Sequence, residues 1–315
     1  MQKPKLMISS CILGNNVRFD GSNKLDQWIT NRLGAFFDIV AVCPEVAMGM
    51  GVPRESVNLR LSKDGHLSMI GNKSNNDYTS LARETSQSIL DNSASELCGA
   101  ILQKKSPSCG VERVKLYNEK NDEIYTIKNS EANRGIFASM LIKQKPMLPV
   151  IDSGRFYDEA ERENFLRRVV CYSRFFSLDG SIKSLQDFHA RYKFVIMEHS
   201  QEKMRQLGNL AANRENKQKE DVYKEYAQLL FEVLLKIPSK KSRTNVFYHL
   251  VGFFKNQLQE DEKKIVHQMI ADYHNNILPY QVPLKMIEYL ITKHEQYYLK
   301  RHYLFNQFPK ELYNK

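Results

Sequence analysis

The chain has 315 residues, a length that favours two domains of ordinary size over one. Apolar residues make up 42% and charged residues 26%, a balance typical of soluble globular proteins, and the apolar runs are too short to span a membrane. The net charge of +10 is compatible with a nucleic acid as substrate or partner, but it does not distinguish such a protein from one that is simply basic.

The N-terminal apolar run and the cysteines both indicate the compartment. The run that follows Lys3 and Lys5 ends at Cys11, and no small-residue cleavage site follows it, so it is not typical of a signal peptide. Five cysteines are an odd number, and in a reducing compartment they are more often thiols or metal ligands than disulfides. We therefore expect a cytoplasmic protein that does not associate with membranes.

Short apolar runs alternate with helical patterns in the first half of the chain. The predicted strands are, in chain order, Lys5–Ser10, Asp38–Cys43, Val57–Leu61, Cys98–Gln103 and Met147–Ile151. The predicted helices between them are Leu25–Phe37, Asp77–Asn92 and Asn133–Lys143. This alternation predicts an α/β domain over residues 1–153, Rossmann-like, with a mostly parallel sheet.

The pattern changes near Asp152, and helical periodicity dominates from there onward. Phe165, Val169 and Tyr172 share one helical face, for example, and Pro283 suits the first turn of a later helix. Strand signals are weak in this half. We therefore predict an all-α helical domain over residues 154–315.

Three cysteines follow predicted strands. Cys11 and Cys43 end the first two strands, and Cys109 follows the strand Cys98–Gln103. The carboxyl ends of parallel strands lie along one edge of a sheet, so the three thiols could meet at one site. Thiolates suit an iron–sulfur cluster or zinc, and three ligands would leave one coordination position open, as in a catalytic centre. Alternatively, each cysteine is a small buried apolar residue, which is our interpretation of Cys98 and Cys171.

Polar side chains lie close to these cysteines in the sequence. Glu45 follows Cys43 by two residues; its carboxylate could move protons or activate water, or it could cap a helix or pair with a cation such as Arg54. Ser106 and Ser108 flank a proline just before the third cysteine. Their hydroxyls could bind or activate a substrate, or they could simply form a turn.

Several motifs of the first half together resemble the thiouracil desulfidase (TudS) family. They are Ser-x-Cys-Ile-Leu-Gly, Val-Arg-Phe-Asp-Gly, Val-Cys-Pro-Glu-Val, Gly-x-Gly-Val-Pro-Arg and Lys-x-Ser-Pro-Ser-Cys-Gly. Members of this family hold a 4Fe-4S cluster through three cysteines, and the open fourth iron takes the sulfur of a thiocarbonyl substrate. The resemblance implies Cys11, Cys43 and Cys109 as cluster ligands. It also implies Glu45 and one serine, Ser106 in preference to Ser108, as catalytic residues.

The second half resembles the YbgA-type domain, through Phe-His-Ala-Arg-Tyr-Lys at 188–193 and Arg-Thr-Asn-Val at 243–246. The fusion of the two resembles the RudS desulfidases, which act on 4-thiouridine in tRNA. It implies a desulfidase domain at 1–153 and a tRNA-binding domain at 154–315. Aromatic residues of Tyr297–Tyr303 could stack on bases or belong to the core. The candidate phosphate contacts are Arg162, Arg167, Arg168, Arg174, Arg191, Lys193, Lys300 and Arg301.

The leading hypothesis is a non-redox, 4Fe-4S-dependent desulfidase that hydrolyses the C–S bond of 4-thiouridine in tRNA and releases hydrosulfide. One alternative is the same reaction on free thiouracil or thionucleosides. A second is a non-catalytic iron–sulfur sensor that binds nucleic acid, which would need no acid–base residue such as Glu45 beside its cluster. A third is a zinc hydrolase that uses the same thiolates. The sequence does not indicate which oligomeric state the protein adopts or which proteins it binds.

Overall fold

The computed structural model describes residues 3–93, 96–118, 120, 122–124, 131–309 and 312. It forms two compact units, Met1–Ser173 with Pro309–Lys315, and Arg174–Phe308. The boundary between the units lies inside the helix α6 (Glu159–Phe176), whereas the sequence prediction places the domain boundary after residue 153. Among the described residues, no helix is both long and apolar enough to cross a membrane.

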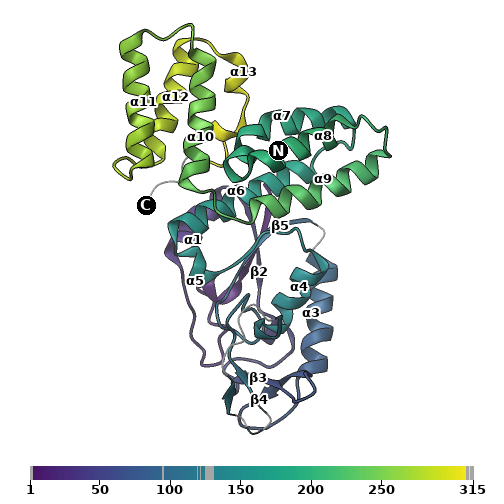
Figure 1. Cartoon of the computed structure of the whole chain (residues 1–315). Coiled ribbons are helices and arrows are strands. Elements are labelled where there is room, and N and C mark those ends of the chain that lie inside the picture. Colours follow the sequence, from purple (N-terminus) through teal and green to yellow (C-terminus); the bar gives the residue numbers. More distant parts are fainter. Residues whose placement is uncertain are drawn as a thin grey trace. The chain divides into compact units, whose positions relative to one another are not determined.

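A parallel sheet forms the centre of the first unit and confirms the predicted α/β fold (Figure 1). Its strand order is β2-β1-β5-β8, and β1 pairs with both β2 and β5 in parallel. Four predicted strands therefore lie in this sheet, and since all of them run parallel, they end at the same edge. The strands are β1 (Lys5–Ser9), β2 (Asp38–Val42), β5 (Leu97–Leu102) and β8 (Val150–Asp152).

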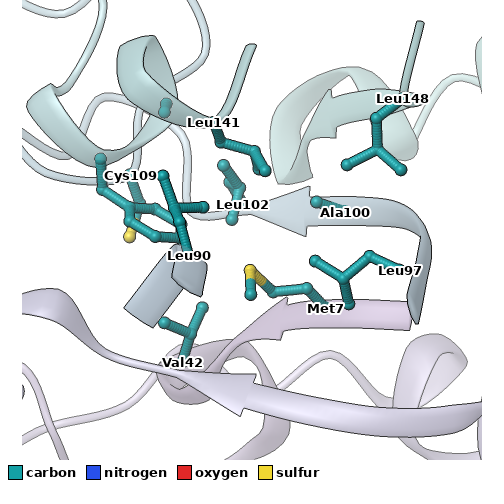
Figure 2. Close-up of a cluster of buried hydrophobic side chains, with 11 residues drawn as sticks. Met7, Val42, Leu90, Leu97, Ala100, Leu102, Cys109, Leu141 and Leu148 are labelled. Carbon is teal, nitrogen blue, oxygen red and sulfur yellow. The ribbon is translucent and has the colours of Figure 1, made fainter. Parts of the chain in front are cut away.

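Helices pack on the parallel sheet and bury its apolar side chains. Figure 2 shows Met7 of β1 and Ala100 of β5 packed with Leu90 of α3 and Leu141 of α4, and Cys109 belongs to the same cluster. The helices of this unit are α1 (Gln27–Arg32), α2 (Pro44–Ala47), α3 (Thr79–Ser93), α4 (Ile136–Gln144), α5 (Ser153–Phe156) and the first part of α6. The short 3-10 helix η1 (Ser10–Leu13) follows β1 directly.

The first unit also has a second sheet, which the sequence analysis did not anticipate. Its order is β4-β3-β6-β7, from β3 (Val57–Leu61), β4 (Leu67–Gly71), β6 (Leu116–Tyr117) and β7 (Glu123–Ile124). The strand β3, which we expected in the mostly parallel sheet, lies in this second sheet, where it pairs antiparallel with β4 and parallel with β6. Gly65, with φ of 81°, allows the tight turn between β3 and β4.

The second unit is helical, as predicted. The helix α7 packs against α8, α9 and α10, and α10 packs against α11 and α12 (Figure 1). Buried apolar residues at helical spacing, such as Val222, Tyr226 and Leu230 of α9, form its core. The elements are α7 (Ile182–His199), α8 (Gln201–Ala212), α9 (Lys219–Leu234), α10 (Lys240–Val251), η5 (Gly252–Phe254), α11 (Glu260–His274), α12 (Gln281–Lys293), α13 (Tyr297–Lys300) and η6 (Tyr303–Phe305).

Candidate functional site

A cavity of about 280 Å³ opens at the carboxyl ends of β1, β2 and β5. Cys11 of η1, Cys43 at the end of β2 and Cys109 of the loop after β5 all line it. The structure thus brings together the three cysteines that the sequence analysis placed at one sheet edge. Cys171 is buried elsewhere, as expected, whereas Cys98 is partly exposed and is not the core residue that we predicted.

Burial dominates the chemistry of the three thiols. Cys11 and Cys109 are buried and Cys43 is half-buried, and all five cysteines are free. Burial, and next the charge of Cys43, raise the pKa of Cys11 to about 11. Burial also raises the pKa of Cys109, and the charges of Glu45 and, to a smaller extent, of Cys43 and Cys11 raise it further. Soft metal atoms bind thiolates, so occupation of this site would release protons.

The three thiols are soft donors, which suit an iron–sulfur cluster or zinc. Within the described ranges, no three His, Cys, Asp or Glu side chains are placed to hold one metal ion together. Three thiolates on one zinc must converge at about 2.3 Å from it. In an iron–sulfur cluster each thiolate binds a different iron, so the sulfurs stand farther apart. Three sulfur donors around one cavity are the type of ligand that the predicted 4Fe-4S group uses, and Cys11, Cys43 and Cys109 are the residues that would hold it.

Glu45 lines the same cavity, and two side chains fix its carboxylate. Pro44 occupies the first turn of α2 after Cys43, which places Glu45 at the cavity wall. Arg54 donates from Nε and Nη2 to Oε2 of Glu45, at 3.1 and 2.6 Å. The hydroxyl of Ser108 donates to Oε1 at 3.0 Å. The pairing with Arg54, one of the alternatives drawn from the sequence, therefore coexists with a position at the site.

Arg54 also joins the loops that carry the site. Its side chain is 4% exposed, and its Nη1 donates to the carbonyl oxygens of Val17 and Gly51, both at 3.0 Å. The Val17 carbonyl also accepts a weak hydrogen bond from Sγ of Cys43 at 3.8 Å. One guanidinium thus holds together the loop after β1 at Val17, the first turn of α2 at Glu45 and the turn at Gly51. The pairing with Glu45 was one of the alternatives drawn from the sequence, but the bonds to Val17 and Gly51 depend on contacts between loops and could not be predicted.

The two candidate serines have different surroundings. Ser106 lines the cavity, and its Oγ accepts hydrogen bonds from the backbone N–H groups of Ser108 and Cys109, at 3.2 and 3.1 Å. Ser108 is 2% exposed and directs its hydroxyl to Glu45. Ser106 therefore shapes the loop of Cys109, whereas Ser108 orients the carboxylate.

The N-terminus of α4 holds the loop of Cys109 against the fold. The N–H groups of Ile136 and Ala138 donate to the carbonyl oxygens of Pro107 and Ser108, at 3.0 and 3.2 Å. A Cβ atom at Gly135 would clash with the backbone of Ser108. Only glycine permits this close approach, so the position of the third thiol depends on a residue that the sequence analysis did not single out.

Several of the basic residues proposed to contact phosphates are used inside the fold. Arg167 is buried in α6 and pairs with Glu163, so the prediction of a phosphate contact there is wrong. The guanidinium of Arg174 packs on the ring of Tyr303, 3.9 Å from its centroid. Lys300 and Arg301 are exposed, as that role requires. Residue type and local charge alone do not separate these two groups.

The first part of the chain matches a known family. Residues 6–153 match the family model of the 2-thiouracil desulfurases. This part of the chain is therefore similar to the 2-thiouracil desulfurases. Residues 193–309 match a second model, described as a protein of unknown function (DUF1722).

Individual proteins are also similar to parts of this chain. Over 128 residues the chain is 28% identical to the uncharacterized protein YbgA of Escherichia coli (strain K12), a match that covers 40% of this chain and 76% of YbgA. A solved structure of the [4Fe-4S]-dependent thiouracil desulfidase TudS is 27% identical, with a TM-score of 0.39, and the match covers 50% of this chain and 95% of that one. The resemblance of the two halves to the thiouracil desulfidase family and to the YbgA-type domain is confirmed.

Proposed function

We propose that the chain is an iron–sulfur-dependent desulfidase that converts 4-thiouridine in tRNA to uridine in the cytoplasm and releases hydrosulfide. The observation that carries the proposal is the cavity of the desulfurase domain, which three thiols and one fixed carboxylate line together. The cofactor would be a 4Fe-4S cluster with three protein ligands and one open iron. When bound, the cluster would supply a Lewis-acidic iron with affinity for sulfur.

The protein side of the reaction rests on Glu45. The two oxygens of its carboxylate differ, because Oε2 accepts two hydrogen bonds from Arg54 and Oε1 accepts one from Ser108. Oε1 therefore has the freer lone pair, and it takes a proton from the water that attacks the thiocarbonyl carbon. The oxygen of that water stays on the carbon as the new carbonyl, and sulfur leaves as hydrosulfide. Arg54 keeps the carboxylate in place throughout.

Positive charge at the edge of the cavity favours a polyanionic substrate over a free base. Lys104 and Lys105 are exposed and line the cavity beside Arg18. The exposed ring of Phe19, which lies under the Arg18 guanidinium at 5.5 Å, is also part of the lining. Cations bind phosphates and an aromatic ring can stack on a base, and both properties suit a nucleotide within RNA.

A substrate comparison tests the proposal. We expect anaerobically reconstituted protein to absorb near 400 nm (roughly the region of thiolate-bound iron–sulfur clusters) and to release sulfide from thiolated tRNA. We expect kcat/KM on tRNA to exceed that on free 4-thiouridine by about 100-fold, the scale of several phosphate contacts. Equal values would favour the free-nucleoside alternative. Full iron without sulfide release from either substrate would favour the sensor, and activity with zinc alone would favour the zinc hydrolase.

The two serines provide a separate prediction. Ser108→Ala removes a hydrogen bond to a carboxylate, so we expect unchanged iron content and a turnover lower by about 10-fold. Ser106→Ala removes the acceptor of two backbone N–H groups in the loop of Cys109, so we expect it to lower iron content as well. Iron per chain and single-turnover rates measure both effects. Full activity in the Ser108 variant would exclude its role in orienting Glu45.

A further inference from the structure

Two aromatic rings stack on the surface of the second unit. Phe253 of η5 and Tyr298 of α13 have ring centroids 5.8 Å apart and planes inclined by 25°. Phe253 is 40% exposed, Tyr298 is 48% exposed, and the neighbouring Tyr297 is 68% exposed. Beneath them the buried His302 contacts Tyr298 edge-on at 4.8 Å. These rings are held in place by the fold, yet a large part of each remains in contact with solvent.

Cations surround the rings. Lys255 and Lys300 are exposed and lie two residues from Phe253 and from Tyr298 in the chain. Lys193 lies 5.5 Å from the centroid of the Phe194 ring, which packs edge-on against Phe253 at 6.2 Å, and the exposed Arg301 directly precedes His302. Burial, and then the charges of Lys193 and Arg301, lower the pKa of His302 to about 4. The aromatic–cationic surface consists of Phe253, Tyr297, Tyr298, Lys193, Lys255, Lys300 and Arg301.

The charge of this surface is not neutralised by the protein. Within the part of the chain that the structure describes, none of its four cations forms an ion pair. Glu295 is the only acidic residue in the segments 249–259 and 289–308, which carry the rings. A hydrogen bond of 3.1 Å from Gln296 to Gln257 joins the two segments and adds amide groups beside the rings.

We propose that the aromatic–cationic surface binds unpaired nucleotides of an RNA strand, with bases stacked on the exposed rings and phosphates held by the four cations. Every base has a face that can stack on an aromatic ring, and base stacking combined with cations is typical of single-strand binding. A partner protein with an apolar surface would bury these cations without counter-charges, which is costly. The choice of RNA as the ligand rests on the proposed tRNA desulfidase function.

Binding of a labelled oligouridylate of about eight nucleotides to the full-length protein tests this surface. We expect Tyr298→Leu, which keeps an apolar side chain but removes the ring, to weaken binding about tenfold, and Tyr298→Phe to bind like the parent. We expect Lys300→Gln with Arg301→Gln to weaken binding and to lower the slope of log affinity against log salt by about 1.4, the value for two phosphate contacts on a single strand.

The matched control is Lys183→Gln with Lys224→Gln. It removes the same charge from Lys183, about 15 Å along α7 from Lys193, and from Lys224 of α9, and it should leave the slope unchanged. The surface proposal is overturned if the parent does not bind oligouridylate, if Tyr298→Leu binds like the parent, or if the control lowers the slope equally.

Sulfide release separates the surface proposal from the proposed function. Oligouridylate binding that depends on the surface, in a protein that desulfurates no thiolated substrate, would support the surface and contradict the function. Desulfuration of tRNA with an unchanged KM in Tyr298→Leu would support the function and contradict the surface.

Discussion

Replacement of Cys11, Cys43 or Cys109 by alanine is expected to remove most of the iron from reconstituted protein and to abolish sulfide release. Each thiol lines the cavity from a different loop, so two remaining thiols cannot hold the cluster at the same position. Loss of a group that merely supports a metal ligand costs 10- to 100-fold in metal affinity, and loss of a ligand is expected to cost more. Iron per chain and the absorbance near 400 nm (roughly the cluster region) measure the effect.

The controls for this prediction are the other two cysteines. Cys171 is buried away from the cavity, and Cys98 is the second residue of β5, at the opposite end of the strand from the cavity, so Cys98→Ala and Cys171→Ala should keep iron and activity. Equal iron loss in all five variants would contradict the assignment of the ligands. It would indicate that alanine at any cysteine unfolds the unit.

Glu45→Gln is expected to keep the cluster and to lower the single-turnover rate by about 100-fold or more, the usual scale of general acid–base catalysis. Glutamine keeps the size of the side chain and one acceptor for Arg54, but it cannot take a proton from water. Because the carboxylate also pairs with a guanidinium that is only 4% exposed, we expect a lower melting temperature as well. Iron content, melting temperature and rate, measured on one preparation, separate the two effects.

Glu55→Gln is the matched control. Glu55 is ten residues further along the chain and lies outside the cavity lining; it accepts hydrogen bonds from the backbone of Lys73 and Ser74 and from the hydroxyls of Ser74 and Tyr78. Its hydrogen bonds, chiefly from Ser74, lower its pKa to about 2. The control should lower the melting temperature at neutral pH and keep the rate. Equal rates in Glu45→Gln and the parent would remove Glu45 from the mechanism.

The sequence predicted the parts of this protein that depend on local pattern. Short apolar runs such as Asp38–Cys43 locate the parallel strands, and their order in the chain places Cys11, Cys43 and Cys109 at one edge. The hairpin of β3 and β4 was not predicted, because the apolar pattern of a five-residue strand does not indicate which sheet the strand joins. The periodicity of apolar residues indicates that one face of a strand is buried, but it does not identify the strand with which it pairs.

The contacts that complete the site could not be predicted from local pattern. Ser108 meets Glu45, and Arg54 reaches the Val17 carbonyl, only because loops distant in sequence fold onto one another. The arginines show the same limit, since Arg167 and Arg301 carry the same charge, but one is buried and the other exposed. Tertiary packing, which single-sequence patterns do not record, decides each case.

The hydrogen bonds around the thiols have a consequence for the order of assembly. The loop of Cys109 is held by the backbone of α4, and the loops of Cys11 and Cys43 are joined through the Val17 carbonyl and Arg54, all by protein atoms. We therefore expect the chain to fold without the proposed cluster and to accept a replacement cluster after oxidative damage without unfolding. Survival of the fold would then be independent of iron supply, and a cell short of iron would keep a reserve of protein ready for activation.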